Sequence, residues 1–149
     1  MTIRNLDALL RPRAIALIGA SERQGSVGRI LLENLTAAFD GPVYPVNPRH
    51  RNLLGIETFE SVAALPSVAD LGVIVTPADT VPALIDELAE AGTRGVCVIT
   101  AGLDPHQRRA MLDAAGPRLL RIIRPNCVGM QEPGHGVNGS FAHLYAHSG

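Results

Sequence analysis

The stretch Ala14–Arg29, AIALIGASERQGSVGR, decides the fold. It opens with the apolar run Ala14–Ile18, which predicts a short buried strand. A loop with glycines at positions 19, 25 and 28 follows, and from Val27 onward the apolar residues recur with helical spacing. A strand, a glycine loop and a helix in this order bring unpaired helix N–H groups beside a loop that can approach a phosphate closely. The stretch therefore predicts a phosphate-bearing ligand.

The composition indicates one domain with an aliphatic core. The chain has 149 residues, 46% of them hydrophobic and only 3% aromatic, which is typical of a parallel sheet covered by helices on both faces. The formal net charge of -1 gives no reason to expect nucleic acid or an anionic membrane as a partner. All 13 basic residues are arginine, which excludes a Walker-type loop, a Schiff-base lysine and a lysine general base within this chain.

Cysteine usage and apolar runs bound the setting of the protein. Two cysteines, Cys97 and Cys127, make neither a disulfide framework nor a metal cluster. No apolar run approaches the roughly 18 residues of a membrane span, and the N-terminal stretch is too short and meets a proline too early for a signal peptide. We therefore expect a cytoplasmic protein.

Strands and helices alternate along the chain. The predicted strands are Ala14–Ile18, Val43–Val46, Asp70–Val75, Gly95–Thr100 and Leu119–Ile123. The predicted helices are a short one at 5–10 capped by Asn5, Val27–Phe39, a helix capped by Asp79 or Thr80 and ended by Gly92, and Pro105–Ala115. This order predicts an α/β fold: a Rossmann-like, doubly wound parallel sheet of about five strands with helices on both faces.

Three segments depart from this alternation. The strand Val43–Val46 carries Pro45 and should lie at or near a sheet edge. The segment Leu53–Phe59 has no clear period, and a single helical turn is expected over Ser61–Leu65. After Val128 no period is sustained, so we expect residues 1–127 to form the domain and residues 128–149 to be an irregular tail leading towards a second domain.

Ligands of such sheets bind outside the carboxyl ends of the strands. The loops at those ends are Gly19–Ser26, Asn47–Arg51, Thr76–Ala78, Thr100–Gly102 and Pro125–Val128, and each is small, polar or proline-rich. Together they favour one crevice lined by several loops.

The glycine spacing disfavours an ordinary NAD site. A dinucleotide loop reads G-x-G-x-x-G and is followed by an acid that binds the ribose, whereas here the spacing is G-x5-G-x2-G and Asn47–Arg51 contains no acid. Arginines at this position suit a ribose that carries an extra phosphate. The residues themselves leave NADP and coenzyme A open.

Five motifs in order resemble a known family. IALIGASERQGSVGR, VYPVNPR, DLGVIVTPADTVP, GVCVITAG and LRIIRPNCVG are similar to the coenzyme A-binding domain of nucleoside-diphosphate-forming acyl-CoA synthetases. That group includes the ADP-forming acetyl-CoA synthetases and the alpha subunit of succinyl-CoA synthetase. The segment GVNGSFAH resembles the large bacterial chains that add an acetyltransferase domain to this body and act as protein lysine acetyltransferases. The resemblance covers roughly Leu6–His143.

The resemblance implies coenzyme A or an acyl-CoA as the ligand. Ala20–Gly25 would wrap its phosphates with Ser26 and Val27 opening the helix behind them, while Asn47–Arg49 would lie at the adenosine end. The implied ligand-binding residues are Gly19, Ala20, Ser21, Arg23, Gln24, Gly25, Ser26, Val27, Asn47, Pro48, Arg49, Thr76, Pro77, Ala78, Ile99, Thr100, Ala101, Asn126 and Cys127. Arg49 would pair with the 3′-phosphate, Thr76–Ala78 would pack near the adenine or pantetheine, and Ile99–Ala101 with Asn126 and Cys127 would line the route to the thiol.

Two residues depart from the family pattern. Arg124 stands where the family usually has glycine, so the local turn is expected to differ. Ala101 stands where the succinyl enzyme has glutamate, which fits the acetyltransferase-linked branch better.

The resemblance places the chemistry outside these residues. The family's phosphorylated histidine and its ATP-grasp lie in further domains, so we expect this segment of an acyl-CoA synthetase-like ligase to bind its ligand and catalyse nothing alone, with no metal site. Its expected partners are coenzyme A or a small-molecule thioester and further domains of a parent chain, and an oligomer is compatible with the sequence. Cys127 is interpreted as a small turn residue and Cys97 as core. The alternatives are an NADP-binding oxidoreductase domain and a scaffold module that has lost its ligand.

Overall fold

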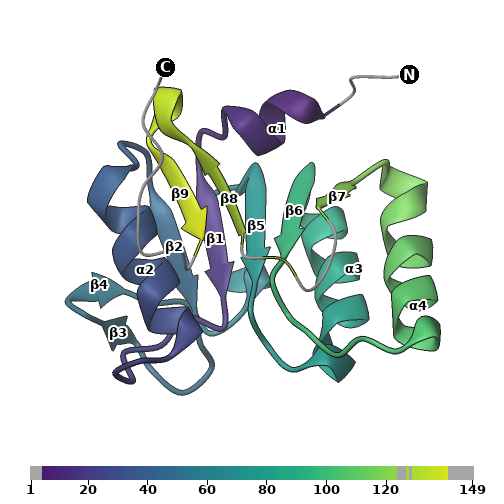
Figure 1. Cartoon of the computed structure of the whole chain (residues 1–149), viewed down its shortest axis with the longest axis horizontal. Coiled ribbons are helices and arrows are strands. Elements are labelled where there is room, and N and C mark those ends of the chain that lie inside the picture. Colours follow the sequence, from purple (N-terminus) through teal and green to yellow (C-terminus); the bar gives the residue numbers. More distant parts are fainter. Residues whose placement is uncertain (1–4, 124–126, 128, 141–149) are drawn as a thin grey trace.

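The computed structural model describes residues 5–123, 127 and 129–140. Its centre is a parallel five-stranded sheet with the order β2-β1-β5-β6-β7 (Figure 1). The strands are β1 (Ile15–Ile18), β2 (Val43–Val46), β5 (Leu71–Ile74), β6 (Gly95–Val98) and β7 (Arg121–Ile123). All five predicted strands are present, and the doubly wound fold is confirmed.

Helices cover both faces of the sheet. They are α1 (Leu6–Leu10), α2 (Val27–Ala38), α3 (Val81–Ala91) and α4 (Pro105–Ala115), and 3-10 turns occur at η1 (Val62–Ala64), η2 (Ala78–Thr80), η3 (Gly116–Arg118) and η4 (Pro133–His135). Helix α2 lies on one face, and α3 and α4 lie on the other (Figure 1).

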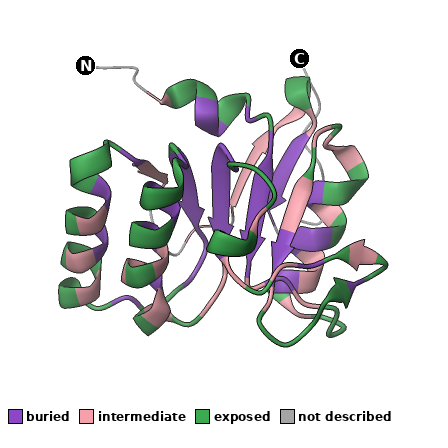
Figure 2. Cartoon of the chain, turned by 180° about the vertical axis from the view of Figure 1, so that it is seen from behind, coloured by how far each residue is buried: buried purple, intermediate pink, exposed green. Residues whose placement is uncertain are grey.

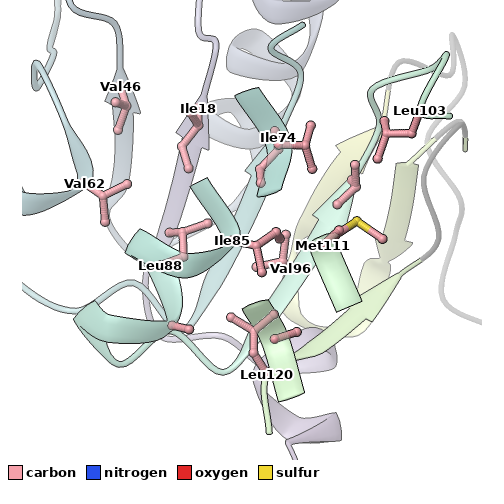
Figure 3. Packing of buried hydrophobic residues seen from close by; sticks show 14 residues of the cluster. Ile18, Val46, Val62, Ile74, Ile85, Leu88, Val96, Leu103, Met111 and Leu120 are labelled. Carbon is pink, nitrogen blue, oxygen red and sulfur yellow. The ribbon is translucent and has the colours of Figure 1, made fainter. Parts of the chain in front are cut away.

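The side chains of each strand alternate between two cores. Leu17 of β1 packs in the cluster on the α2 face, whereas its neighbour Ile18 packs in the cluster under α3 and α4. Figure 2 shows the central strands of the sheet in purple, and β1, β5 and β6 are buried along their whole length. In Figure 3, Ile85 and Leu88 of α3 and Met111 of α4 lie over the second face of the sheet. Both faces are therefore apolar, which explains the continuous apolar runs of the sequence.

The helix ends follow the sequence signals in part. Asp104 caps α4 in a capping box with Gln107, and Gly92 ends α3 in the left-handed conformation. Two predicted caps are wrong. Asn5 makes no side-chain cap of α1, because its Nδ2 donates to the carbonyl of Leu119 at 2.8 Å. Thr80 makes no cap of α3 either, because its hydroxyl contacts the preceding turn.

Strand β2 is an edge of the five-stranded sheet, as its proline predicts. The carbonyl of Pro45 accepts a hydrogen bond from the N–H of Phe59 at 2.9 Å, on the side away from β1. Since the backbone N and O of one strand residue face the same side, the absent N–H of Pro45 also faces outward. The ladder to β1 therefore loses nothing.

A small hairpin forms in the segment without a clear period. It pairs β3 (Asn52–Leu53) with β4 (Ile56–Glu57), and the side chain of Leu53 is fully buried. The turn η1 confirms the predicted helical turn over Ser61–Leu65.

The expectation of an irregular tail is wrong for residues 129–140. They form an antiparallel hairpin of β8 (Gly129–Glu132) and β9 (Val137–Ser140), which packs on the α2 face (Figure 1). Val137 is fully buried, and the side-chain amide of Asn34 on α2 donates to the carbonyl of Ser140 at 2.7 Å. The domain boundary at Cys127 stays a prediction. Within the described ranges, no helix is long and apolar enough to cross a membrane.

Candidate functional site: a cleft at the carboxyl ends of the strands

The sheet order creates a crevice between β1 and β5. The chain runs from β1 to β2 on one side and then crosses to β5 on the other, so the connections leave the sheet in opposite directions at this point. A cavity of about 520 Å³ opens there. Six of the predicted ligand residues line it: Gly19, Ala20, Ser21, Asn47, Pro48 and Thr76. Three loops that are distant in the sequence therefore meet at one cavity.

Sequence reasoning missed the other walls of this cavity. They are Glu60, Ser61 and Val62 before and in η1, and Thr80, Ala83, Leu84 and Glu87 on and before α3. The first group reaches the cavity because Phe59 bridges to Val46, which lays the following residues beside the end of β2. The predicted helical turn and the partly apolar face of α3 were the only sequence signals for these walls.

The glycine loop is held tightly against the start of α2. Gly19 has a φ of 96°, a conformation that favours glycine. A Cβ on Gly28, in the first turn of α2, would overlap the carbonyl oxygen of Gly19 and lie 3.3 Å from atoms of Ser21. The helix start and the strand end can approach each other only because Gly28 has no side chain.

Polar side chains fix the shape of this loop. Ser26 caps α2 by accepting the N–H of Arg29 at 3.2 Å, and its hydroxyl donates to the carbonyl of Arg23 at 2.7 Å. The hydroxyl of Ser21 accepts the N–H of Arg23 at 3.0 Å. The guanidinium of Arg29 donates to the carbonyl of Glu22 at 2.8 Å and pairs with Glu33 one turn later. Arg29 thus ties the loop to α2, a role that its position in the motif did not reveal.

Asn47 joins the loops that follow β1 and β2. Its Nδ2 donates to the carbonyl of Ala20 at 3.0 Å, and its Oδ1 accepts the N–H of Arg49 at 2.8 Å. Arg49 itself is exposed, and within the described part of the chain its guanidinium has no acidic partner. The turn therefore presents a positive charge without an acidic partner one residue after Pro48, which lines the cavity.

Threonine hydroxyls connect the loops after β5 and β6. The hydroxyl of Thr100 donates to the carbonyl of Thr76 at 2.7 Å. That of Thr80 donates to the carbonyl of Pro77 at 2.6 Å and lies 2.7 Å from the Thr76 hydroxyl. The Thr100 bond links the segments after β5 and β6, while the two contacts of Thr80 stabilise the turn that follows β5.

Cys127 lies beside the end of β6. Its Sγ is 3.5 Å from the carbonyl oxygen of Val98 and 3.9 Å from the Sγ of Cys97. The Cys97 thiol lowers the pKa of Cys127 to about 6 against the effect of burial, and the N–H of Gly129 adds to this lowering. The same contact, together with burial, raises the pKa of Cys97. Cys97 is fully buried, so its predicted core position is confirmed.

The other predicted ligand residues that the structure describes do not line the cavity. Ile99 is buried in the core on the α2 face, Ala101 is exposed, and Asn126 lies outside the described residues, as does Arg124. The predicted ligand residues that are described but do not line the cavity are Arg23, Gln24, Gly25, Ser26, Val27, Arg49, Pro77, Ala78, Ile99, Thr100, Ala101 and Cys127. Their roles toward a ligand stay predictions.

The sheet order, the glycine loop and the cleft define a class: a Rossmann-like α/β domain with its pocket at the topological switch point. Residues 13–133 match the protein family described as CoA binding domain. The chain belongs to this family, and the predicted resemblance is confirmed.

Relatives of known activity are synthetases of much greater length. The chain is 34% identical over 142 residues to the ADP-forming acetate–CoA ligase of Methanocaldococcus jannaschii, covering 93% of this chain and 20% of that protein. It is 35% identical to the alpha subunit of ADP-forming acetate–CoA ligase II of Pyrococcus furiosus, covering 91% of this chain and 31% of that subunit. The chain thus spans between a fifth and a third of these relatives.

A solved structure shows the same fold in such a relative. The dinucleotide-forming acetyl-coenzyme A synthetase 1 of Ca. Korarchaeum cryptofilum, solved in complex with phosphate and ADP, matches with a TM-score of 0.86 at 32% identity. The match covers 91% of this chain and 30% of that one. These comparisons do not favour an NADP-binding oxidoreductase domain.

Proposed function

We propose that this chain binds coenzyme A or an acyl-CoA in the cleft between β1 and β5. The observation that carries the proposal is the position of the α2 N-terminus, which the glycine loop holds beside a cavity in a domain of the CoA-binding family. Such a helix start binds phosphate through its N–H groups and its dipole. The pyrophosphate of the coenzyme would lie against the loop from Ala20 to Gly25.

Unused hydrogen-bond donors support this position for the phosphates. Within the described part of the chain, the backbone N–H groups of Val27 and Gly28 make no hydrogen bond to the protein, whereas the next one, of Arg29, is capped by Ser26. Glu60 and Glu87 also line the cavity, one just before η1 and the other on α3. Their carboxylates would repel a phosphate, so the charge pattern favours phosphates at α2 and the neutral parts of the ligand toward α3.

Arg49 would bind the 3′-phosphate of the adenosine. Its backbone is fixed by Asn47, its guanidinium is exposed, and no acid in the described residues neutralises it. Asn47 and Pro48 would contact the adenosine, while Thr76, Pro77 and Ala78 would lie near the adenine or pantetheine. Ile99, Thr100, Ala101 and Cys127 would line the path of the thiol.

Isothermal calorimetry with coenzyme A, dephospho-coenzyme A and NADP tests the proposal. Wild type should bind coenzyme A more tightly than the dephospho form, which lacks the 3′-phosphate. A charge-assisted hydrogen bond contributes about 1.5–3 kcal/mol, so Arg49→Ala should weaken coenzyme A binding by about 10- to 100-fold. The same variant should leave the affinity for dephospho-coenzyme A nearly unchanged.

Arg118→Ala is the matched control, because Arg118 is an exposed arginine in η3, at the opposite end of the sheet, where β7 is about to begin. It should bind both forms of the coenzyme as wild type does. Tight binding of NADP without binding of coenzyme A would overturn the proposal. No binding of any of the three would support a scaffold module instead.

We further propose that the chain is the N-terminal part of a cytoplasmic, ADP-forming acyl-CoA synthetase-like protein. In that setting the domain presents the thiol or thioester to other domains, or reports acyl-CoA to a fused acetyltransferase. The sequence of the gene beyond Gly149 tests this. A phosphohistidine domain with an ATP-grasp would support a synthetase, and a degenerate body with an acetyltransferase would support the regulatory role. If the gene encodes neither arrangement, both roles are refuted.

A further inference from the structure

Two free thiols face each other near the carboxyl ends of neighbouring strands, outside the lining of the cleft. Cys97 lies in the centre of the buried strand β6, and Cys127 follows β7. Their Sγ atoms are 3.9 Å apart, while the Sγ of Cys127 also reaches the carbonyl of Val98. The described residues hold no other cysteine, so this contact joins the two thiols of the sequence.

The spacing leaves the pair one short movement from a disulfide. A disulfide has a sulfur–sulfur distance of about 2.05 Å, so the sulfurs must approach by about 1.9 Å. The two thiols differ in access, because Cys97 is fully buried and Cys127 is partly exposed. Of the two thiols, Cys127 is the one that a reagent from solution can reach, and Cys97 is placed to react with an oxidised Cys127 sulfur.

We propose that Cys97 and Cys127 form a peroxide-reactive dithiol, in which Cys127 attacks a hydroperoxide and Cys97 closes an intramolecular disulfide. This proposal does not depend on coenzyme A binding, although Cys127 is also one of the residues predicted to line the path of the coenzyme's thiol. The oxidant is a small hydroperoxide such as hydrogen peroxide.

The chemistry balances in two steps. The Cys127 thiolate attacks one peroxide oxygen, the O–O bond breaks, and Cys127 becomes a sulfenic acid while hydroxide leaves. The sulfur of Cys97 then attacks the Cys127 sulfur, the S–O bond breaks, and the hydroxyl leaves as water with the Cys97 proton. The two sulfurs together lose one electron pair, which the peroxide has gained.

The electrostatics of the pair suit this division of roles. The contact with Cys97 lowers the pKa of Cys127, so Cys127 is thiolate at neutral pH to a greater extent than an ordinary cysteine, which titrates near 8.5. The pKa of Cys97 is raised by its contact with Cys127 and by burial, so Cys97 stays protonated while Cys127 is the thiolate. Once Cys127 is a sulfenic acid that negative charge is gone, and Cys97 can transfer its proton to the departing hydroxyl as it attacks. Cys97 would also protect Cys127 from further oxidation, because disulfide closure competes with sulfinic acid formation.

Peptide mapping after peroxide treatment tests the proposal. The fully reduced chain is treated with hydrogen peroxide without coenzyme A, blocked with an alkylating reagent and digested with trypsin. Because the chain has no lysine and Arg124 precedes proline, Cys97 falls in the fragment 95–108 and Cys127 in the fragment that begins at Ile122. We expect these two fragments joined by a disulfide within one chain, with an intact mass lower by two hydrogen atoms.

Two variants separate the roles of the thiols. In Cys97→Ala, Cys127 loses the contact that lowers its pKa and should react more slowly, but its sulfenic acid should be trapped by dimedone and, without dimedone, should proceed to the sulfinic acid. In Cys127→Ala, Cys97 should stay reduced. Far-UV circular dichroism checks that each variant folds, and the wild-type map does not depend on either.

Three results would overturn the proposal: sulfinic acid at Cys127 in wild type without the linked fragments, linkage only between two chains, or two unreacted thiols. None of them bears on coenzyme A binding, because the assay contains no coenzyme.

Discussion

Gly28 is the residue at which the fold and the proposed ligand site depend on each other most directly. In Gly28→Ala the new methyl group would overlap the carbonyl oxygen of Gly19, and this obstacle is backbone that no rotamer change can move. Overpacking costs up to about 3 kcal/mol, while the better helix propensity of alanine returns about 1 kcal/mol. We therefore expect the free energy of unfolding to fall by about 2 kcal/mol, or Tm by about 4–8 °C at this chain length.

The strain in Gly28→Ala can be relieved only by moving the loop away from α2. A moved loop no longer presents its N–H groups together with those of the helix start, so coenzyme A should bind at least about tenfold more weakly. Stability is measured by urea unfolding followed by far-UV circular dichroism, because the chain has no tryptophan. Affinity is measured by calorimetry on the same samples.

Gly139→Ala is the matched glycine control. Gly139 lies in β9, and a Cβ there would meet no atom outside its chain neighbours closer than 3.7 Å, which is ordinary van der Waals contact. This variant should be unchanged or more stable by about 0.4–1 kcal/mol, with wild-type affinity. If Gly28→Ala matched wild type within about 0.5 kcal/mol and bound coenzyme A equally well, the close packing of loop and helix would be refuted.

Two further predictions concern stability. Burial acts to raise the pKa of Asp70, but the Arg13 N–H and guanidinium and the Arg94 guanidinium lower it below its usual range. Asp70→Asn should therefore lower the free energy of unfolding by about 1.5–3 kcal/mol above pH 5. Urea unfolding from pH 3 to 7 should show this difference between wild type and variant shrinking as the pH falls below about 4, because Asp70 is then protonated. A constant difference would contradict the ion pairing. Val137→Ala should cost about 2 kcal/mol, because it empties a fully buried site under the β8–β9 hairpin. The control Leu112→Ala on the exposed face of α4 should cost less than about 0.5 kcal/mol, and equal effects would show that the hairpin is not docked.

The sequence predicts the sheet well because its signals are local. Each strand of the sheet is a short apolar run, and α4 carries its own start signal in Asp104 and Pro105. The predicted caps at Asn5 and Thr80 were wrong because each side chain binds another acceptor. Asn5 donates to the carbonyl of the distant Leu119, and Thr80 donates to the carbonyl of the nearby Pro77. A hydroxyl or amide binds the nearest well-placed acceptor, which spacing alone does not identify.

The β8–β9 hairpin escaped prediction because its pattern is not that of a strand. Gly129, Gly136 and Gly139 interrupt it, and its turn contains a proline. What stabilises it is tertiary: Val137 fills the α2-side core, and Asn34 binds the backbone at its end. A glycine-rich segment reads as a loop when its packing partner is unknown.

The residues of the candidate site also differ in whether a local sequence signal or a tertiary contact brings them to the cavity. Gly19, Ser21 and Asn47 could be named because each directly ends or follows a recognisable strand, and the parallel topology brings such positions together. Glu60 and Glu87 could not, because Glu60 reaches the cavity only through the bridge from Phe59 to Val46, and Glu87 only through the packing of α3. Both acidic residues line the cavity, and in the proposed binding mode their carboxylates would disfavour phosphates beside them. A motif therefore predicts where a phosphate binds, but the orientation of the rest of the ligand depends on residues that only the folded chain brings into place.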